Sequence, residues 1–126
     1  MDFIKQKPIY LQMADRLCER IMAGEWGEDE RIPSVRDLAV TLGVNPNTAM
    51  RTFDYLQGKE IIYNHRGVGY FVSPKAKERI FEKSRQCFLE EELPEFVQKM
   101  KLLGFTWQEV MEANNPKNKS DYATIL

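Results

Sequence analysis

Three polar residues between positions 44 and 56 have the types and the spacing needed to bind base edges in DNA. Asn47, Arg51 and Asp54 fall on one side of a helix when successive residues are placed about 100° apart. Arginine hydrogen-bonds to guanine, asparagine to adenine, and aspartate to the amino group of cytosine. The alternative is a solvated polar face without a ligand, which is the commoner arrangement on an isolated helix. The elements predicted around these residues therefore help to decide between a DNA-binding face and a solvated one.

The segment that carries these side chains has the start of a helix. Asn45 is suited to cap the first turn, and Pro46 fits the first helical position, where no partner for an N–H is needed. Val44 and Ala49 stand where a hydrophobic staple would join the entering chain to the helix. Gly58 is expected to end it in a left-handed conformation. The face opposite the polar one is apolar and is expected to be buried; it carries Ala49, Phe53 and Leu56, with Thr48 and Tyr55 at its flank.

A shorter helix is predicted immediately before this one. Ser34 is its expected cap, with Asp37 three residues later, and Gly43 is its expected end. Only Val44 separates the two helices from cap to cap, so the pair predicts a helix-turn-helix, whose second helix enters a major groove. Ser34 and Arg36 lie at the first helix's N-terminus, where they suit a phosphate. Ser34 is expected to cap the helix with or without that contact.

A further helix and a turn are predicted before the helix-turn-helix. Residues 7–22 read as a helix, with Pro8 in its first turn, Gly24 at its end, and an apolar residue every four positions at Ile9, Met13, Leu17 and Ile21. A turn with a short extended piece follows, in which Trp26 is expected to close the edge of the core.

A β-hairpin is predicted after the helix-turn-helix. Its strands are 61–64 and 70–73, and the connection HRGVG supplies the glycines of a tight turn. A hairpin in this position makes a winged helix. His65 and Arg66 lie at its tip beside Gly67 and Gly69, so the backbone and an arginine could approach a narrow minor groove.

Taken together, PIYLQMADRLCERIMAGEW, RIPSVRDLAVTLGVNPNTAMRTFDYLQGKEIIY and HRGVGYFV resemble the N-terminal DNA-binding domain of the GntR family of bacterial transcriptional regulators. The resemblance runs from about Pro8 to Val72. The NPNTA pattern is similar to the YtrA-like subfamily, whose members have short C-terminal parts. Many family members carry basic residues where this chain has Pro46 and Met50, which leaves Arg36 and Arg51 as the chief cations. The resemblance implies that DNA is contacted by Ser34, Arg36, Asn47, Thr48, Arg51, His65, Arg66, Gly67 and Gly69.

The fold predicted from these segments is mainly α within an α+β class. Residues 1–73 form the winged helix-turn-helix and residues 74–126 a short helical dimerisation region. In that region, Pro94 is expected to kink or break a helix, Gly104 to end the next one, and a capping box at Thr106 and Glu109 to start a last helix over about 107–113. The tail from Asn114 onward has no periodicity and is expected to be a loop, whose last five residues could dock on a neighbour.

Residues 74–126 are too few to bury a core and also enclose a typical ligand cavity. Their apolar stripe needs a partner, either the chain's own winged helix or a second copy. We favour a two-fold homodimer because operators usually mirror the symmetry of the protein that binds them, and the YtrA-like resemblance implies the same.

Composition excludes several other classes of protein. The 126 residues are 43% hydrophobic and 29% charged, with a net charge of −1, so a packed soluble domain is expected without a global basic signal. No apolar run approaches the ~20 residues that span a bilayer, and the N-terminus lacks the core of a signal peptide, which predicts a cytoplasmic protein. Cys18 and Cys87 are expected to be buried free thiols. With one histidine, no metal-ligand spacing and no phosphate loop, no metal or cofactor is predicted, and an enzyme is the weakest interpretation.

Two functions remain open from the sequence. The first is a homodimeric transcriptional regulator, a repressor, that binds an inverted-repeat operator in double-stranded DNA. The alternative is a protein-interaction module that kept the winged helix and lost DNA binding, which the net charge and the Pro46 and Met50 replacements favour. A small-molecule effector is left unassigned under both.

Overall fold

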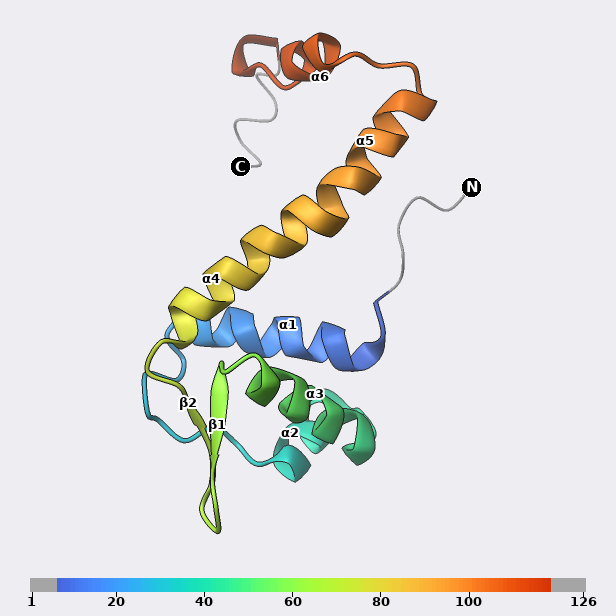
Figure 1. The fold of residues 1–126 in the computed structure, drawn as a ribbon. Helices are drawn as coiled ribbons and strands as arrows, with labels where there is room; N and C mark the ends of the chain where they lie inside the picture. The colour runs from blue at the N-terminus through green and yellow to red at the C-terminus, as the bar shows by residue number, and fades with distance from the viewer. Residues whose placement is uncertain (1–6, 119–126) are drawn as a thin grey trace. The chain divides into compact units, whose positions relative to one another are not determined.

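The computed structural model describes residues 7–118. Within that range the chain divides into two compact units, residues 7–86 and residues 87–118, which are described separately. Along the chain the elements are α1 (Ile9–Met22), α2 (Val35–Leu42), α3 (Pro46–Gly58), β1 (Ile62–His65), β2 (Gly69–Val72), α4 (Ala76–Cys87), the π-helical turn η1 (Phe88–Glu92), α5 (Leu93–Leu102), α6 (Trp107–Ala113) and the 3-10 turn η2 (Pro116–Asn118) (Figure 1). The mainly helical fold with one small hairpin confirms the predicted class.

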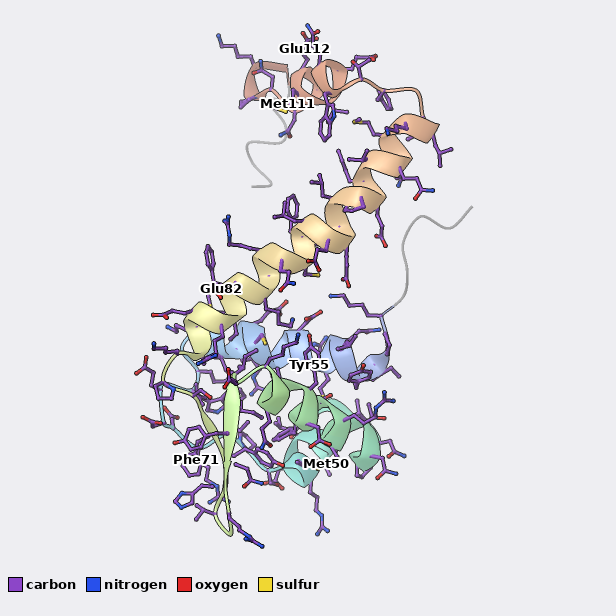
Figure 2. The ribbon with its side chains drawn as sticks, in the orientation of Figure 1. Met50, Tyr55, Phe71, Glu82, Met111 and Glu112 are labelled. Atoms are coloured by element: carbon purple, nitrogen blue, oxygen red, sulfur yellow. The ribbon has the colours of Figure 1, made fainter. Side chains whose placement is uncertain are left out.

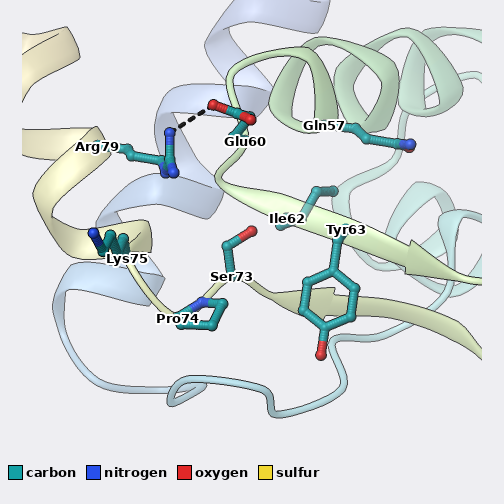
Figure 3. Close-up of a pocket in the computed structure, with 8 residues that line it drawn as sticks. All are labelled: Gln57, Glu60, Ile62, Tyr63, Ser73, Pro74, Lys75 and Arg79. Atoms are coloured by element: carbon teal, nitrogen blue, oxygen red, sulfur yellow. Dashed lines mark hydrogen bonds and ion pairs between the residues drawn. The ribbon is translucent and has the colours of Figure 1, made fainter.

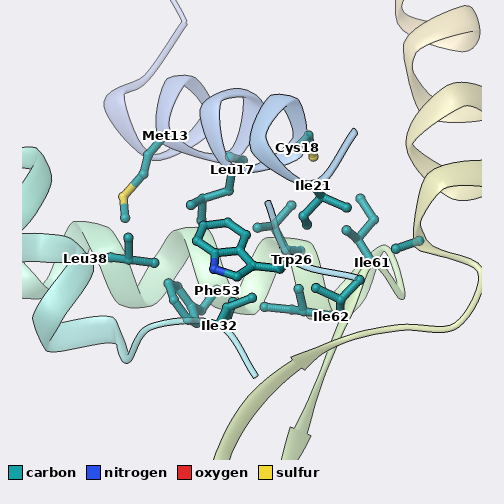
Figure 4. Packing of buried hydrophobic residues seen from close by; sticks show 14 of the residues in the cluster. Met13, Leu17, Cys18, Ile21, Trp26, Ile32, Leu38, Phe53, Ile61 and Ile62 are labelled. Atoms are coloured by element: carbon teal, nitrogen blue, oxygen red, sulfur yellow. The ribbon is translucent and has the colours of Figure 1, made fainter. Parts of the chain in front are cut away.

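The first unit is a winged helix built around one hydrophobic core. Helices α1, α2 and α3 pack together, and the β1–β2 hairpin follows α3 (Figure 1). The core draws on every one of these elements, and Figure 4 shows it with Leu17, Ile21, Leu38, Phe53 and Ile62 among its members. Trp26 is buried at its edge, as predicted.

The start of α4 also belongs to this core. Ala76 and Ile80 are buried in the same cluster as the residues of the winged helix. An ion pair between Lys83 Nζ and Asp15 Oδ1, 3.6 Å apart, joins α4 to α1. The first compact unit consequently continues past the end of the wing, to residue 86.

The predicted starts of α2 and α3 are confirmed at the level of single hydrogen bonds. Ser34 Oγ accepts from the Asp37 N–H at 3.1 Å, and Asn45 Oδ1 accepts from the Asn47 N–H at 2.8 Å. Gly43 ends α2 with φ +65°, the left-handed conformation that glycine adopts readily. Because each cap satisfies donors that the first turn leaves free, the tight turn between the two helices is determined locally.

The predicted end of α3 is wrong by two residues. Gly58 remains helical, and the left-handed residue is Glu60, with φ +60°. The Glu60 N–H donates to the Gln57 carbonyl and the Ile61 N–H to the Leu56 carbonyl, which is the Schellman pattern. The physical reason is tertiary: Ile61 is fully buried, so the chain reverses at the position that brings Ile61 into the core.

A smaller correction applies to α1. Pro8 is its N-cap residue, outside the helix, because α1 begins at Ile9. Gly24, with φ +84°, follows the helix end as expected.

The hairpin is antiparallel, and its register pairs Ile62 with Val72 and His65 with Gly69. A bridge from Arg31 to Phe71 adds the short extended piece predicted before α2. The Ile32 N–H donates to the Tyr70 carbonyl at 2.9 Å, so this piece covers the free edge of β2.

In the second unit, the kink or break expected at Pro94 takes the form of a π-helical turn, η1, directly before α5. The Leu93 N–H donates to the Phe88 carbonyl, five residues earlier, and Pro94 falls in the first turn of α5. A proline has no N–H to donate, and the wider turn before it places that missing donor at a helix start.

The end of the second unit follows the prediction. Gly104 has φ +77°, and the capping box is complete: the Glu109 N–H donates to Thr106 Oγ1, and the Thr106 N–H to Glu109 Oε1. Residues 119–126, including the segment predicted to dock on a neighbour, lie outside the described range.

The two cysteines differ in burial. Cys18 is buried in α1, as expected, whereas Cys87 is only half-buried, and its Sγ lies 3.2 Å from Glu91 Oε2. The expectation of a buried thiol is therefore wrong for Cys87, because the neighbouring residues 84–86 and 88–92 are exposed and provide no core around it. In residues 7–118, no helix is long and apolar enough to cross a membrane.

Candidate DNA-binding surface

Helix α3 presents the predicted polar face to solvent. Asn47, Arg51 and Asp54 are exposed, and Thr48 is half-buried at the flank. On the opposite side Ala49, Phe53 and Leu56 are fully buried. The assignment of faces made from spacing alone is therefore confirmed.

Pro46 and Met50, the two positions where the family resemblance leads us to expect basic residues, have structural roles here. Pro46 is in the first turn of α3. Met50 is half-buried and packs against the core (Figure 2). Arg51 is consequently the only basic residue in the first two turns of α3.

The Arg51 side chain is held in place by an aromatic ring that sequence analysis did not assign to the site. Its guanidinium carbon lies 4.2 Å from the centre of the Tyr10 ring, within the range of a cation–π contact. Tyr10 in turn meets Tyr55 edge-to-face, with ring centres 6.2 Å apart. The buried Thr52 hydroxyl donates to the Tyr10 carbonyl at 2.7 Å, which fixes α1 against α3. In the sequence Tyr10 lies beside Ile9 and widens the apolar stripe of α1. Nothing in that pattern indicates a contact with Arg51, which lies in α3.

The N-terminus of α2 offers a second group of donors. Ser34 and Arg36 are exposed there. Ser34 Oγ is already the acceptor of the cap hydrogen bond, and its hydroxyl hydrogen can still be donated outward. A helix N-terminus with an exposed guanidinium and hydroxyl is suited to bind a phosphate.

The tip of the wing carries His65, Arg66, Gly67 and Val68, all exposed. Gly67 has φ +79°, a conformation that L side chains rarely adopt. The His65 ring leans on Phe71, with ring centres 5.8 Å apart. The turn therefore holds an arginine and a histidine at the end of a narrow hairpin.

Gly69 has a second reason to be glycine. A Cβ at this position, where φ is +146°, would lie 2.9 Å from Arg31 Nε. Arg31, exposed on the segment that pairs with β2, therefore packs its guanidinium directly against the wing backbone. The sequence analysis did not identify Arg31 as a neighbour of the wing, because the contact joins residues 31 and 69, which are far apart in the chain.

The wing and α3 are connected through Tyr70. Its ring meets Phe53 edge-to-face with centres 4.8 Å apart. Burial raises the pKa of the Tyr70 hydroxyl, the Asp54 charge raises it further, and a hydrogen bond with Asn64 acts in the opposite direction. Tyr70 thus stays protonated at neutral pH and joins the exposed face of α3 to β1.

No other chemistry gathers at this surface. Across the part of the chain that the structure describes, no three His, Cys, Asp or Glu side chains come together as metal ligands. His65 is exposed at the end of β1, and its ring contacts only Phe71 among the ring contacts of the described residues.

The arrangement of caps, faces and wing matches a known family of regulators. The family model described as bacterial regulatory proteins, gntR family, matches residues 9–72, a range that includes all nine predicted contact residues. The chain belongs to the GntR family. This GntR-family chain is accordingly a transcriptional regulator and not an enzyme.

Relatives of this regulator include short members of the family. The uncharacterised HTH-type transcriptional regulator YhcF of Bacillus subtilis is 38% identical over 110 residues, which cover 87% of this chain and 89% of the relative. The HTH-type transcriptional repressor YtrA of the same organism is 31% identical over 71% of this chain and 68% of its own length. The resemblance to the YtrA-like subfamily is confirmed by these matches.

Solved structures agree with the sequence relatives. A GntR-family regulator from Bacteroides thetaiotaomicron superimposes with a TM-score of 0.70 at 44% identity, covering 84% of this chain and 92% of the other. The DNA-binding domain of AraR, solved in complex with operator ORX1, superimposes with a TM-score of 0.52 at 26% identity, covering 54% of this chain and 82% of that domain.

Proposed function

We propose that this regulator is a homodimeric repressor that binds an inverted-repeat operator, with α3 in the major groove. The observation that carries the proposal is the exposed Arg51, stacked on Tyr10 beside Asn47 on a polar helix face. AraR uses a domain of the same fold to bind an operator, and YtrA is named a repressor. A regulator of chromosomal DNA acts in the bacterial cytoplasm.

Within this proposal the nine predicted residues divide by role. Asn47, Thr48 and Arg51 contact base edges, and Ser34 and Arg36 contact a phosphate at the end of α2. The wing residues His65, Arg66, Gly67 and Gly69 approach the adjacent minor groove, where the glycines let the backbone come close.

The proposal of a dimer rests on the second unit. Phe96, Leu103 and Trp107 are each about half or more exposed, and Met100 is the only buried hydrophobic residue among 87–118. An apolar surface of this kind on a small helical unit is a typical site of self-association. Two copies would present two α3 helices to two half-sites of one duplex.

Binding to the promoter region upstream of its own gene tests the proposal. The full chain is titrated against that DNA in mobility-shift and footprinting assays at several salt concentrations. Arg51→Ala is expected to lose ~1–3 kcal/mol of specific binding and to relax the preference at one base pair. Arg85→Ala removes the same charge from α4, outside the proposed contact surface, and is expected to bind like the parent protein.

Affinity for the operator is also expected to fall steeply with salt, because phosphate contacts release counterions. Absence of any footprint at low salt would exclude the proposal. Stoichiometric capture of a protein partner by the same sample would then favour the interaction-module alternative.

A further inference from the structure

A cavity of about 400 Å³ opens in the first unit, away from the proposed DNA contacts (Figure 3). It lies where the end of α3, the base of the wing and the start of α4 meet, and all of its lining residues fall between 57 and 79. Small-molecule pockets in proteins have volumes of about 300–1,000 Å³. The cavity is thus large enough for a metabolite of modest size, and no residue of it is used by the proposed function.

The charged groups of this cavity favour an anion. Arg79 lines it from α4, Lys75 from the turn just before α4, and Glu60 from the turn after α3 (Figure 3). These three side chains carry a net charge of about +1, and Lys75 is exposed and forms no ion pair with an acidic side chain of residues 7–118. The Ser73 side chain and the Tyr63 ring add a hydroxyl and an apolar wall.

Arg79 is incompletely used by the protein. Its Nη1 donates to Glu60 Oε2 at 2.6 Å, but its Nε is buried and makes no hydrogen bond within the described residues. A guanidinium binds an oxyanion best through two parallel N–H donors. A ligand oxyanion that replaces Glu60 and lets the guanidinium turn would satisfy both donors.

We propose that this cavity binds a small organic oxyanion, a carboxylate or phosphate ester with an apolar body. The oxyanion lies between Lys75 and Arg79, and the apolar body lies against Pro74 and the Tyr63 ring. Glu60 is the group that the ligand displaces from Arg79.

The position of Glu60 connects this site to DNA binding, and this part rests on the proposed function. Glu60 is the left-handed residue that joins α3 to β1, and its ion pair with Arg79 ties that joint to α4. A ligand that competes for Arg79 breaks its ion pair with Glu60, so the turn between the recognition helix and the wing is no longer held to α4. It shifts the population of DNA-competent molecules only as far as it binds the two states differently.

The binding step is tested without DNA, by titrating the 15N-labelled full chain in NMR. The probes are benzoate and phenyl phosphate, with benzyl alcohol as the neutral control. The anionic probes are expected to give saturable shifts at the amides of Glu60 and of residues 73–79, and benzyl alcohol is not. Lys75→Gln removes one of the two cations and is expected to weaken that binding by about tenfold, which corresponds to ~1.4 kcal/mol. Lys77→Gln makes the same change on an exposed position of α4 that does not line the cavity, and is expected to have no effect.

Two results would overturn the proposal. The first is the absence of saturable shifts with both anions at about 10 mM, well above a dissociation constant of 1 mM. The second is a loss of operator affinity and salt dependence in Lys75→Gln without any probe, which would make the cavity a contact for DNA phosphate. Because the titration needs no DNA, failure of operator binding and failure of this site are separate observations.

Discussion

Arg51 and Tyr10 form a unit at the scale of single residues. A cation over an aromatic face contributes about 0.5–1 kcal/mol at an exposed site. Its further effect is to restrict a long side chain before DNA arrives, so that less conformational entropy is lost on binding. Tyr10 is thus a positioning residue for Arg51.

Replacing Tyr10 by leucine tests this role. Tyr10→Leu keeps an apolar side chain on α1 but removes the ring under the guanidinium, and operator affinity is expected to fall by about 0.5–1 kcal/mol. In an Arg51→Ala background the same change is expected to have little effect, because the two residues act together. Affinities of the four proteins, measured by fluorescence anisotropy, give the coupling. Additive losses would contradict the positioning role.

The Cys18 thiol is expected to be unreactive in the folded protein. Burial raises its pKa to about 11, outweighing the opposing charge of Lys83. At pH 8 only on the order of one thiol in a thousand is then ionised, and the buried thiolate is also out of reach.

A Cys87→Ser variant isolates this thiol for measurement. Its labelling by a disulfide reagent at pH 8 is expected to be complete in urea and to be limited by unfolding in buffer. Fast labelling of the folded variant would show that α1 is not packed as described.

At the scale of elements, the wing depends on a glycine that faces an arginine. Gly69→Ala introduces a Cβ at φ +146° and 2.9 Å from Arg31 Nε. The substitution is expected to destabilise the first unit by about 1–3 kcal/mol, the usual cost of such a backbone conformation.

Gly58 supplies the matched control. It is helical and has open space around its Cβ position, so Gly58→Ala is expected to stabilise the protein by about 0.5–1 kcal/mol. Urea unfolding followed by circular dichroism measures both variants. Equal stabilities for the two variants would exclude the proposed requirement for glycine at position 69.

At the scale of the whole molecule, the second unit leaves most of its large apolar side chains exposed to solvent. Phe96 and Trp107 contact each other, with ring centres 6.2 Å apart, yet both remain about half exposed. A helical unit this short buries too little surface to be stable alone. We therefore expect a second copy to cover these residues.

Leu103→Glu tests the homodimer. Leu103 is 60% exposed at the end of α5, and a charge there is expected to shift the protein from dimer to monomer at micromolar concentration. Lys101→Glu places the same side chain on an exposed polar position two residues away and is expected to stay dimeric. Sedimentation equilibrium distinguishes these states. A parent protein that sediments as a monomer would exclude the dimer.

Local contacts explain which features the sequence could predict. The caps at Ser34, Asn45 and Thr106 depend on residues two or three positions away, so composition and spacing were sufficient. The faces of α3 followed from helical periodicity for the same reason. The nine DNA-contacting residues came from the family resemblance, and their contacts stay a prediction.

Contacts between distant segments were decided only by the tertiary structure. Burial of Ile61 moved the left-handed residue from Gly58 to Glu60, and packing of α1 on α3 brought Tyr10 under Arg51. The cavity beside Arg79 likewise requires α3, β1 and α4 to meet. The sequence by itself determined where helices begin and which side of each is polar, because those properties depend on neighbours in the chain. Contacts between distant segments depend on how the helices and the hairpin pack around the core, which neighbours in the chain do not determine.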